Sequence, residues 1–340
     1  MYAQMDTPCS VGILEPMKKP DKDNLSFYEN KLQNKSVAIV SIPLELGSDA
    51  RGLAAAPKYL RRHGLEGMLK SLGCNISENL TIPVAKSEKT GARNAKHLHA
   101  VADTMLRAYS AVEKAAKRGD FVLALGGDNA ISIGTISGAA AAYPTLGVIW
   151  IDAHSDCNTP ETTMTGNIHG MPAATVMGFG DPALTGIGTA RPKVRPENFL
   201  YIGLTDMDPA EIEFIRKHGI AAVTMLDIAR RGLSPVTEAV DALAKKVDAV
   251  WVTWDIDSID ETFAPGVAMT SCGGLSDREA LGIARYIGKT CRLAGIDIAE
   301  MLPAKDINGK TADIALELIG LLLGSDSGGY RDYMQKYEER

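Results

Sequence analysis

The chain has 340 residues, of which 45% are hydrophobic and 23% are charged, and its net charge is −6. This composition is typical of a globular protein that buries a substantial core. The negative charge and the lack of any basic run argue against a nucleic-acid surface. The lack of an apolar run of about 18 residues argues against a membrane span. The start of the chain has no apolar signal-peptide core, and five scattered cysteines predict reduced thiols in a cytoplasmic protein.

Apolar runs alternate with amphipathic segments along the chain. Strands are predicted at residues 37–43, 121–125, 148–151, 199–202, 221–223, 250–253 and 293–298. Helices are predicted at residues 54–72, 96–118, 132–143, 209–218, 235–246, 277–290 and 310–323. Because continuous apolar strands are typical of a parallel sheet covered on both faces, we predict an α/β fold, a three-layer α/β/α sandwich with a mostly parallel sheet.

No repeat or low-complexity linker divides the chain. We interpret residues 36–325 as one folded domain, with an N-terminal extension at residues 1–35 and a charged tail at residues 326–340. Ligands of open parallel sheets bind beyond the carboxyl ends of the strands. The residues that follow the predicted strands are therefore where chemistry is expected.

Acidic side chains follow two of the predicted strands. Asp152, His154 and Asp156 come after strand 148–151 at a spacing of i, i+2 and i+4, and alternation along an extended chain lets all three project to one side. Strand 250–253 leads in the same way into Asp255 and Asp257. Carboxylates and an imidazole that converge on one point are costly to leave unpaired, and a divalent metal would offset that cost.

Together the two segments supply four carboxylates and one imidazole, enough charge to balance two divalent cations. An oxygen-rich set with one imidazole suits manganese better than zinc, and two ions about 3.5–4 Å apart can bind and activate a shared water. A lone Asp-x-Asp is commonly a helix cap. Two such clusters, each at the end of a strongly apolar strand, instead favour a binuclear metal site.

Four motifs resemble the signatures of the arginase (ureohydrolase) family. They are Gly-Gly-Asp-Asn-Ala-Ile-Ser-Ile-Gly-Thr from Gly126, Asp-Ala-His-Ser-Asp-Cys-Asn-Thr-Pro from Asp152, Gly-Asn-Ile-His-Gly from Gly166 and Asp-Ile-Asp-Ser-Ile-Asp-Glu-Thr-Phe-Ala-Pro-Gly from Asp255. The resemblance extends over about residues 36–324. It implies the same three-layer fold and a catalytic domain that hydrolyses a guanidinium group at a binuclear manganese site.

The metal ligands implied by the resemblance are Asn129, Asp152, His154, Asp156, Asp255 and Asp257. Asp152 and Asp255 match the family's bridging aspartates, and His154 and Asp257 match the second metal site. The family carries a histidine where this chain has Asn129. An amide oxygen is neutral, like imidazole, but is a weaker ligand for a transition metal. We therefore expect two Mn²⁺ ions per subunit, with weaker binding at the first site.

The resemblance also assigns catalytic and substrate-binding positions. Asp156 would shuttle a proton, His169 would transfer protons near neutral pH, and Glu300 would pair with the substrate guanidinium. The implied substrate-binding residues are Asn158, Thr163 and Thr165 for an α-carboxylate, and Asp208 and Glu211 for an α-amino group. The run from Asp208 to Glu211 also has the pattern of a helix start with acids in its first turn, and the two roles are compatible.

Three functions fit these residues. An arginase that converts L-arginine to L-ornithine and urea is favoured by the residues that match an amino-acid clamp. A different ureohydrolase would act on agmatine, guanidinobutyrate or another guanidine. A non-catalytic protein with the arginase fold is favoured by Asn129 and by Met269, which stands where the family has a small hydroxyl residue. The expected partners are a small guanidino substrate and copies of the chain itself, as a trimer or hexamer.

Overall fold

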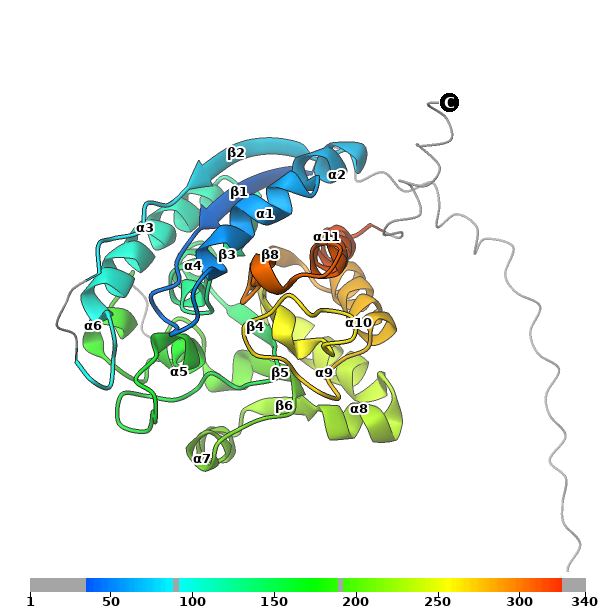
Figure 1. Cartoon of the computed structure of the whole chain (residues 1–340). Coiled ribbons are helices and arrows are strands. Elements are labelled where there is room, and N and C mark those ends of the chain that lie inside the picture. The colour runs from blue at the N-terminus through cyan, green and yellow to red at the C-terminus, as the bar shows by residue number, and fades with distance from the viewer. Residues whose placement is uncertain (1–34, 88–91, 189–191, 326–340) are drawn as a thin grey trace, which may run out of the picture.

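The computed structural model describes residues 35–87, 92–188 and 192–325, and its centre is one sheet of eight parallel strands (Figure 1). Along the sheet the order is β2-β1-β3-β8-β7-β4-β5-β6. The bounds are β1 Ser36–Ile42, β2 Asn75–Thr81, β3 Phe121–Gly126, β4 Leu146–Ile151, β5 Phe199–Leu204, β6 Ala221–Thr224, β7 Ala249–Asp255 and β8 Leu293–Ala299. All but the edge strands β2 and β6 are almost wholly buried, because helices cover both faces. The predicted α/β/α sandwich is confirmed.

Two helical layers cover the sheet (Figure 1). The helices are α1 Ala56–Arg62, α2 Leu65–Ser71, α3 Leu98–Lys117, α4 Ile131–Ala140, α5 Pro172–Val176, α6 Pro182–Thr185, α7 Pro209–His218, α8 Met225–Arg231, α9 Ser234–Ala244, α10 Asp277–Thr290 and α11 Lys310–Leu322. Helices α1, α2 and α8 to α11 pack into one apolar core, and α3 to α7 contribute to the other. Each fully buried aliphatic side chain stabilises the fold by about 1.5–3 kcal/mol. No helix in the described ranges is both long and apolar enough to cross a bilayer.

The structure differs from the sequence prediction at some elements. The helix predicted over residues 54–72 is two helices, α1 and α2, because Gly64 between them has a φ of 99°, which favours glycine. Strand β2 was not predicted, since its alternating polar sequence lacks the continuous apolar run of the inner strands. The short helices α5, α6 and α8 were also not predicted. Residues 1–34 and 326–340, which hold nearly all of the predicted extension and tail, lie outside the described ranges.

A fully buried carboxylate joins β8 to β7 and α4. Asp297 of β8 accepts hydrogen bonds from two residues of α4, Ser132 Oγ at 3.1 Å and Thr135 Oγ1 at 2.5 Å. It accepts a third from Trp251 Nε1 of β7 at 2.8 Å. Burial raises the pKa of Asp297 to about 6, although these donors oppose the rise. Because α4 begins shortly after Asn129, this network helps to fix the position of that residue.

Asp297→Ala is expected to lower the free energy of unfolding by about 2–4 kcal/mol, because it leaves buried indole and hydroxyl donors unpaired. Asp297→Asn retains an acceptor oxygen and should lose less. The raised pKa means that folding takes up a proton between about pH 4 and pH 6, so this carboxyl makes the wild type less stable as the pH rises through that window. Asp297→Asn should lack this contribution. Chemical denaturation from pH 4 to 7 measures the free energy of unfolding of the wild type and both variants. Equal stability of the wild type and Asp297→Ala would contradict this role of Asp297.

Candidate metal centre and active site

Polar side chains gather at the carboxyl ends of the four central strands. Asn129 lies three residues after β3, Asp152 follows β4, Asp255 ends β7 and Glu300 follows β8. These strands are neighbours in the order β3-β8-β7-β4, so their ends meet at one edge of the sheet. Parallel sheets bind ligands at such edges.

Asn129 lies among three of the predicted metal ligands. Its Nδ2 donates hydrogen bonds to Asp255 Oδ2 at 2.6 Å, to Asp156 Oδ2 at 3.0 Å and to Asp152 Oδ2 at 3.2 Å. The other amide atom, Oδ1, is buried and has no hydrogen-bond partner among the described residues. An amide nitrogen is a donor only, so in this orientation Asn129 stabilises the carboxylates by hydrogen bonds and could not coordinate a metal through Nδ2. Rotation of the amide would direct Oδ1 to a cation held by the same carboxylates.

Asp152, His154 and Asp257 form a second cluster beside the first. Each offers a ligand atom, and these atoms lie within 4.8 Å of one another. His154 Nδ1 is 3.2 Å from Asp257 Oδ2 and 3.5 Å from Asp152 Oδ1. Asp257 Oδ1 is buried with no partner in the described chain. Since Asp152 contacts both Asn129 and His154, the two clusters share that carboxylate.

The carboxylates of this centre repel one another in a buried environment. Burial, followed by the charge of Asp152, raises the pKa of Asp257 to about 7. Burial and neighbouring carboxylates hold the pKa values of Asp156 and Asp255 well above their usual range. Burial opposes a charge on His154, but the hydrogen bonds and charges of Asp152 and Asp257 outweigh it and raise its pKa to about 12. Divalent cations would relieve this repulsion, so the donor set fits the metals expected from the sequence.

Glu300 and His169 stand beside the metal cluster. Glu300 Oε1 accepts a hydrogen bond from the backbone N–H of Asn129 at 2.9 Å and lies 3.0 Å from His169 Nδ1. Burial opposes a charge on His169, but Glu300 in particular raises its pKa to about 10. Glu300 and Asp156 have φ values of 61° and 48°, a region that residues other than glycine rarely adopt and that is concentrated at functional sites.

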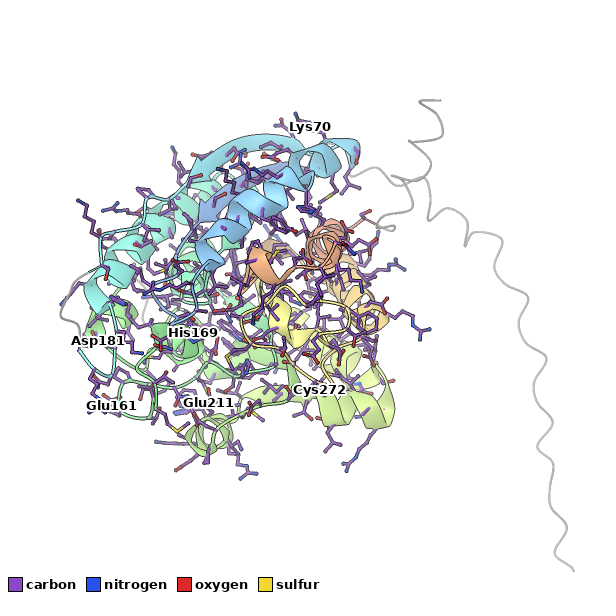
Figure 2. The ribbon with its side chains drawn as sticks, viewed as in Figure 1. Lys70, Glu161, His169, Asp181, Glu211 and Cys272 are labelled. Atoms are coloured by element: carbon purple, nitrogen blue, oxygen red, sulfur yellow. The ribbon has the colours of Figure 1, made fainter. Side chains whose placement is uncertain are left out.

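The predicted substrate residues lie in the loop after Asp156 and at the start of α7. Asn158 Nδ2 donates to Asp208 Oδ2 at 2.9 Å, which joins the two segments. Asp208 caps α7 together with Glu211, whose buried carboxylate accepts from the backbone N–H groups of Cys157 and Asp208. Figure 2 labels Glu211 on α7 and His169 beside α5. The carboxylate of Glu211 is thus occupied by hydrogen bonds at the start of α7. Asp208 is the less buried acid of the pair.

Thr163 and Thr165 shape the loop that precedes His169. Their Oγ1 atoms accept hydrogen bonds from the backbone N–H groups of Gly166 and Asn167, at 3.0 and 3.1 Å. A hydroxyl that accepts in this way keeps its own hydrogen for another acceptor. Both side chains therefore retain the donor that an α-carboxylate would need.

A profile of the arginase family matches residues 35–324. The chain belongs to the arginase family. It is 39% identical to the arginase of Bacillus caldovelox over 85% of this chain and 98% of that relative, and 36% identical to the arginase of Brevibacillus brevis over 86% and 98%. The solved structure of the Bacillus caldovelox arginase superposes with a TM-score of 0.83, covering 85% of this chain and 98% of that one.

Several residues of this arginase-family site were not predicted from the sequence. Trp150 Nε1 donates to Asp152 Oδ2 at 2.9 Å, and its position two residues before Asp152 was the available signal. Asp128 accepts from the backbone N–H of Gly47 at 2.7 Å, while the Gly47 carbonyl accepts from the N–H of His169 at 3.1 Å. No sequence pattern linked Gly47 to the site, because this contact depends on the path of a loop.

Proposed function

We propose that this arginase-family chain hydrolyses the guanidinium C–N bond of L-arginine to give L-ornithine and urea. The observation that carries the proposal is the placement of the Glu300–His169 pair directly against the buried carboxylate cluster. A planar guanidinium pairs well with a carboxylate, and the cluster lies where its carbon would be exposed to an activated water. The arginase relatives support the same substrate.

We infer that two divalent ions, manganese in our proposal, are held by these residues. Asn129 and Asp156 would complete the first site, His154 and Asp257 the second, and Asp152 with Asp255 would contribute to both. When bound, the ions supply charge neutralisation and activation of water at neutral pH.

The side chains of the chain would divide the remaining work. Glu300 Oε1 is engaged by Asn129 and His169, which leaves Oε2 to receive a guanidinium N–H. Asp156 would accept a proton from the attacking water and pass it to the leaving amine. His169, with 21% of its side chain exposed, would exchange protons with solvent. Asp208 and Asn158 would bind the α-amino and α-carboxylate ends of the substrate.

Substrate preference tests this assignment. L-Arginine is expected to have a higher kcat/KM than agmatine, because agmatine has no carboxylate for Asn158, Thr163 or Thr165 to bind. Loss of a charge-assisted contact costs about 1.5–3 kcal/mol, roughly a tenfold to hundredfold change in kcat/KM. Urea release by the manganese-loaded protein measures kcat/KM for both substrates. A preference for agmatine would favour the other ureohydrolase function, and no release from either would favour the non-catalytic one.

The role of Asp208 needs a control because this residue also caps α7. Asp208→Ser keeps a capping side chain but removes the negative charge. We expect it to lower kcat/KM for L-arginine by at least about tenfold and to leave 5-guanidinopentanoate, the arginine analogue that lacks only the α-amino group, largely unaffected. Glu213→Ala, at an exposed position of the same helix, should change neither. Equal losses on both substrates would show that Asp208 does not bind the α-amino group.

A cytoplasmic location and a trimeric or hexameric assembly are further parts of the proposal. The four described cysteines, Cys74, Cys157, Cys272 and Cys291, are free thiols, which suits a reducing compartment. Light scattering on the purified protein tests the subunit number.

A further inference from the structure

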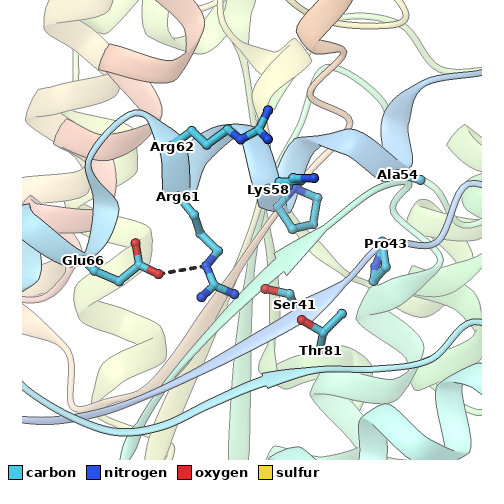
Figure 3. Close-up of a pocket in the computed structure, with 9 residues that line it drawn as sticks. Ser41, Pro43, Ala54, Lys58, Arg61, Arg62, Glu66 and Thr81 are labelled. Atoms are coloured by element: carbon cyan, nitrogen blue, oxygen red, sulfur yellow. Dashed lines mark hydrogen bonds and ion pairs between the residues drawn. The ribbon is translucent and has the colours of Figure 1, made fainter.

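A cavity of about 640 Å³ lies apart from the metal centre, between α1 and the strands β1 and β2 (Figure 3). Its floor includes Ser41 near the end of β1 and Thr81 at the end of β2, which are partners in the register of the two strands. One wall is apolar and is formed by Pro43, Ala54 and Pro57. None of its lining residues belongs to the candidate active site. The volume is in the range of small-molecule sites.

The cavity carries an excess of positive charge in a chain that is negative overall. Lys58, Arg61 and Arg62 of α1 line it, with Glu66 as the one acidic lining residue. Arg61 Nε pairs with Glu66 Oε1 at 2.8 Å, whereas the terminal nitrogens of Arg61 have no partner among the described residues. The same holds for the side chains of Lys58 and Arg62. Figure 3 shows Arg61 extending from α1 toward Ser41 and Thr81.

Ser41 is the second observation that points to a ligand. The residue is 2% exposed, and its Oγ has no hydrogen-bond partner within the described part of the chain. A buried hydroxyl without a partner is destabilising and unusual in native proteins. In this cavity the hydroxyl would donate a hydrogen bond to a ligand oxygen, and the same oxygen would accept a hydrogen bond from a terminal nitrogen of Arg61.

We propose that this cavity binds a small organic anion, a phosphate or carboxylate group attached to a short apolar body. The oxyanion would contact Ser41 and Arg61, with Lys58 adding charge, because guanidinium groups bind such oxygens in a bidentate manner. The apolar body would lie against Pro43 and Pro57. The proposal goes beyond the hydrolase function and does not depend on it.

Calorimetric titration of the manganese-loaded protein tests the site with three probes: phenyl phosphate, inorganic phosphate and benzoate. Phenyl phosphate is expected to bind one per chain. Binding of inorganic phosphate but not benzoate would assign the site to phosphate groups, whereas binding of benzoate but not inorganic phosphate would assign it to anions with an apolar body. The proposal is overturned if none of the three binds at concentrations up to about 10 mM.

Variants separate this cavity from the metal centre, which could itself bind phosphate. Lys58→Gln and Arg61→Gln should each weaken the binding of phenyl phosphate by about tenfold or more. Lys70→Gln, an exposed lysine of α2 outside the cavity, should not. If both cavity variants bind phenyl phosphate with unchanged affinity, the proposal is overturned. That result would have no bearing on the proposed hydrolase function, which the urea assay tests separately.

Ser41→Ala gives a readout that a purely structural serine would not produce. Because the hydroxyl is unpaired without ligand, the variant should melt at the same temperature as the wild type or higher. Its stabilisation by phenyl phosphate should nevertheless be smaller. A lower Tm without ligand, together with an undiminished shift on addition of phenyl phosphate, would show that Ser41 has another role and would exclude it from the site.

Discussion

Asp255→Asn is expected to abolish metal binding and urea release. Asp255 is 2% exposed, and its Oδ2 contacts the Asn129 amide while its Oδ1 accepts the N–H of Asp257. The substitution removes a charge that both proposed metal sites would share. An ion present at a hundred times its Kd stabilises the wild type by about 2.7 kcal/mol, and the variant should lose this gain. Metal analysis after incubation with Mn²⁺, with thermal melting alongside, measures both effects.

The same variant should be more stable than the wild type when no metal is bound. Burial, followed by the charges of Asp257 and Asp152, raises the pKa of Asp255 well above its usual range, so a neutral amide relieves repulsion in the empty centre. This gain distinguishes the loss of a ligand from a general folding defect. Asp313→Asn, at an exposed position of α11, is the matched control and should change neither metal content nor activity. Full metal retention by Asp255→Asn would place the ligands elsewhere.

Asn129→His is expected to strengthen the first site, so that the metal content reaches about two ions per subunit at lower Mn²⁺, and to increase urea production at low Mn²⁺. The amide nitrogen of Asn129 contacts three carboxylates as a donor, and its oxygen is a weaker ligand than imidazole for a transition metal. The resemblance to arginases implies a histidine here. Metal analysis, supported by calorimetric titration of the metal-free protein with Mn²⁺, gives a readout that is independent of activity.

Asn129→Ala provides the comparison for this position. It supplies no ligand and removes the hydrogen bonds that the carboxylates receive, so the metal-free variant should be less stable than the wild type and should bind no more than about one ion. If Asn129→His alters neither the metal content nor the rate, Asn129 is not what limits the first site.

Much of the site could be predicted because its residues are local to strands. The apolar runs of β4 and β7 identified those strands, and their ends located Asp152 and Asp255 at one edge of a parallel sheet. The sequence also predicted that His154 would lie near Asp152, but on the ground of an extended chain, whereas the chain bends at Ala153 and His154 and Asp156 has a φ of 48°. The motif around Asn129 showed the departure from the family, since it needs only the order of residues.

The contacts that tertiary structure alone decided join segments distant in the sequence. Asn129 Nδ2 reaches acids that follow two other strands, Gly47 bonds to Asp128, and Asp297 gathers donors from α4 and β7. The strand β2 was missed because its residues alternate between exposed and half-buried, so that this edge strand needs no continuous apolar run. The sequence by itself determined the sandwich, the family and the acidic cluster, since apolar periodicity and short motifs are local. Which way the Asn129 amide points, and where a cationic cavity opens beside β1, depended on how helices and loops pack in three dimensions.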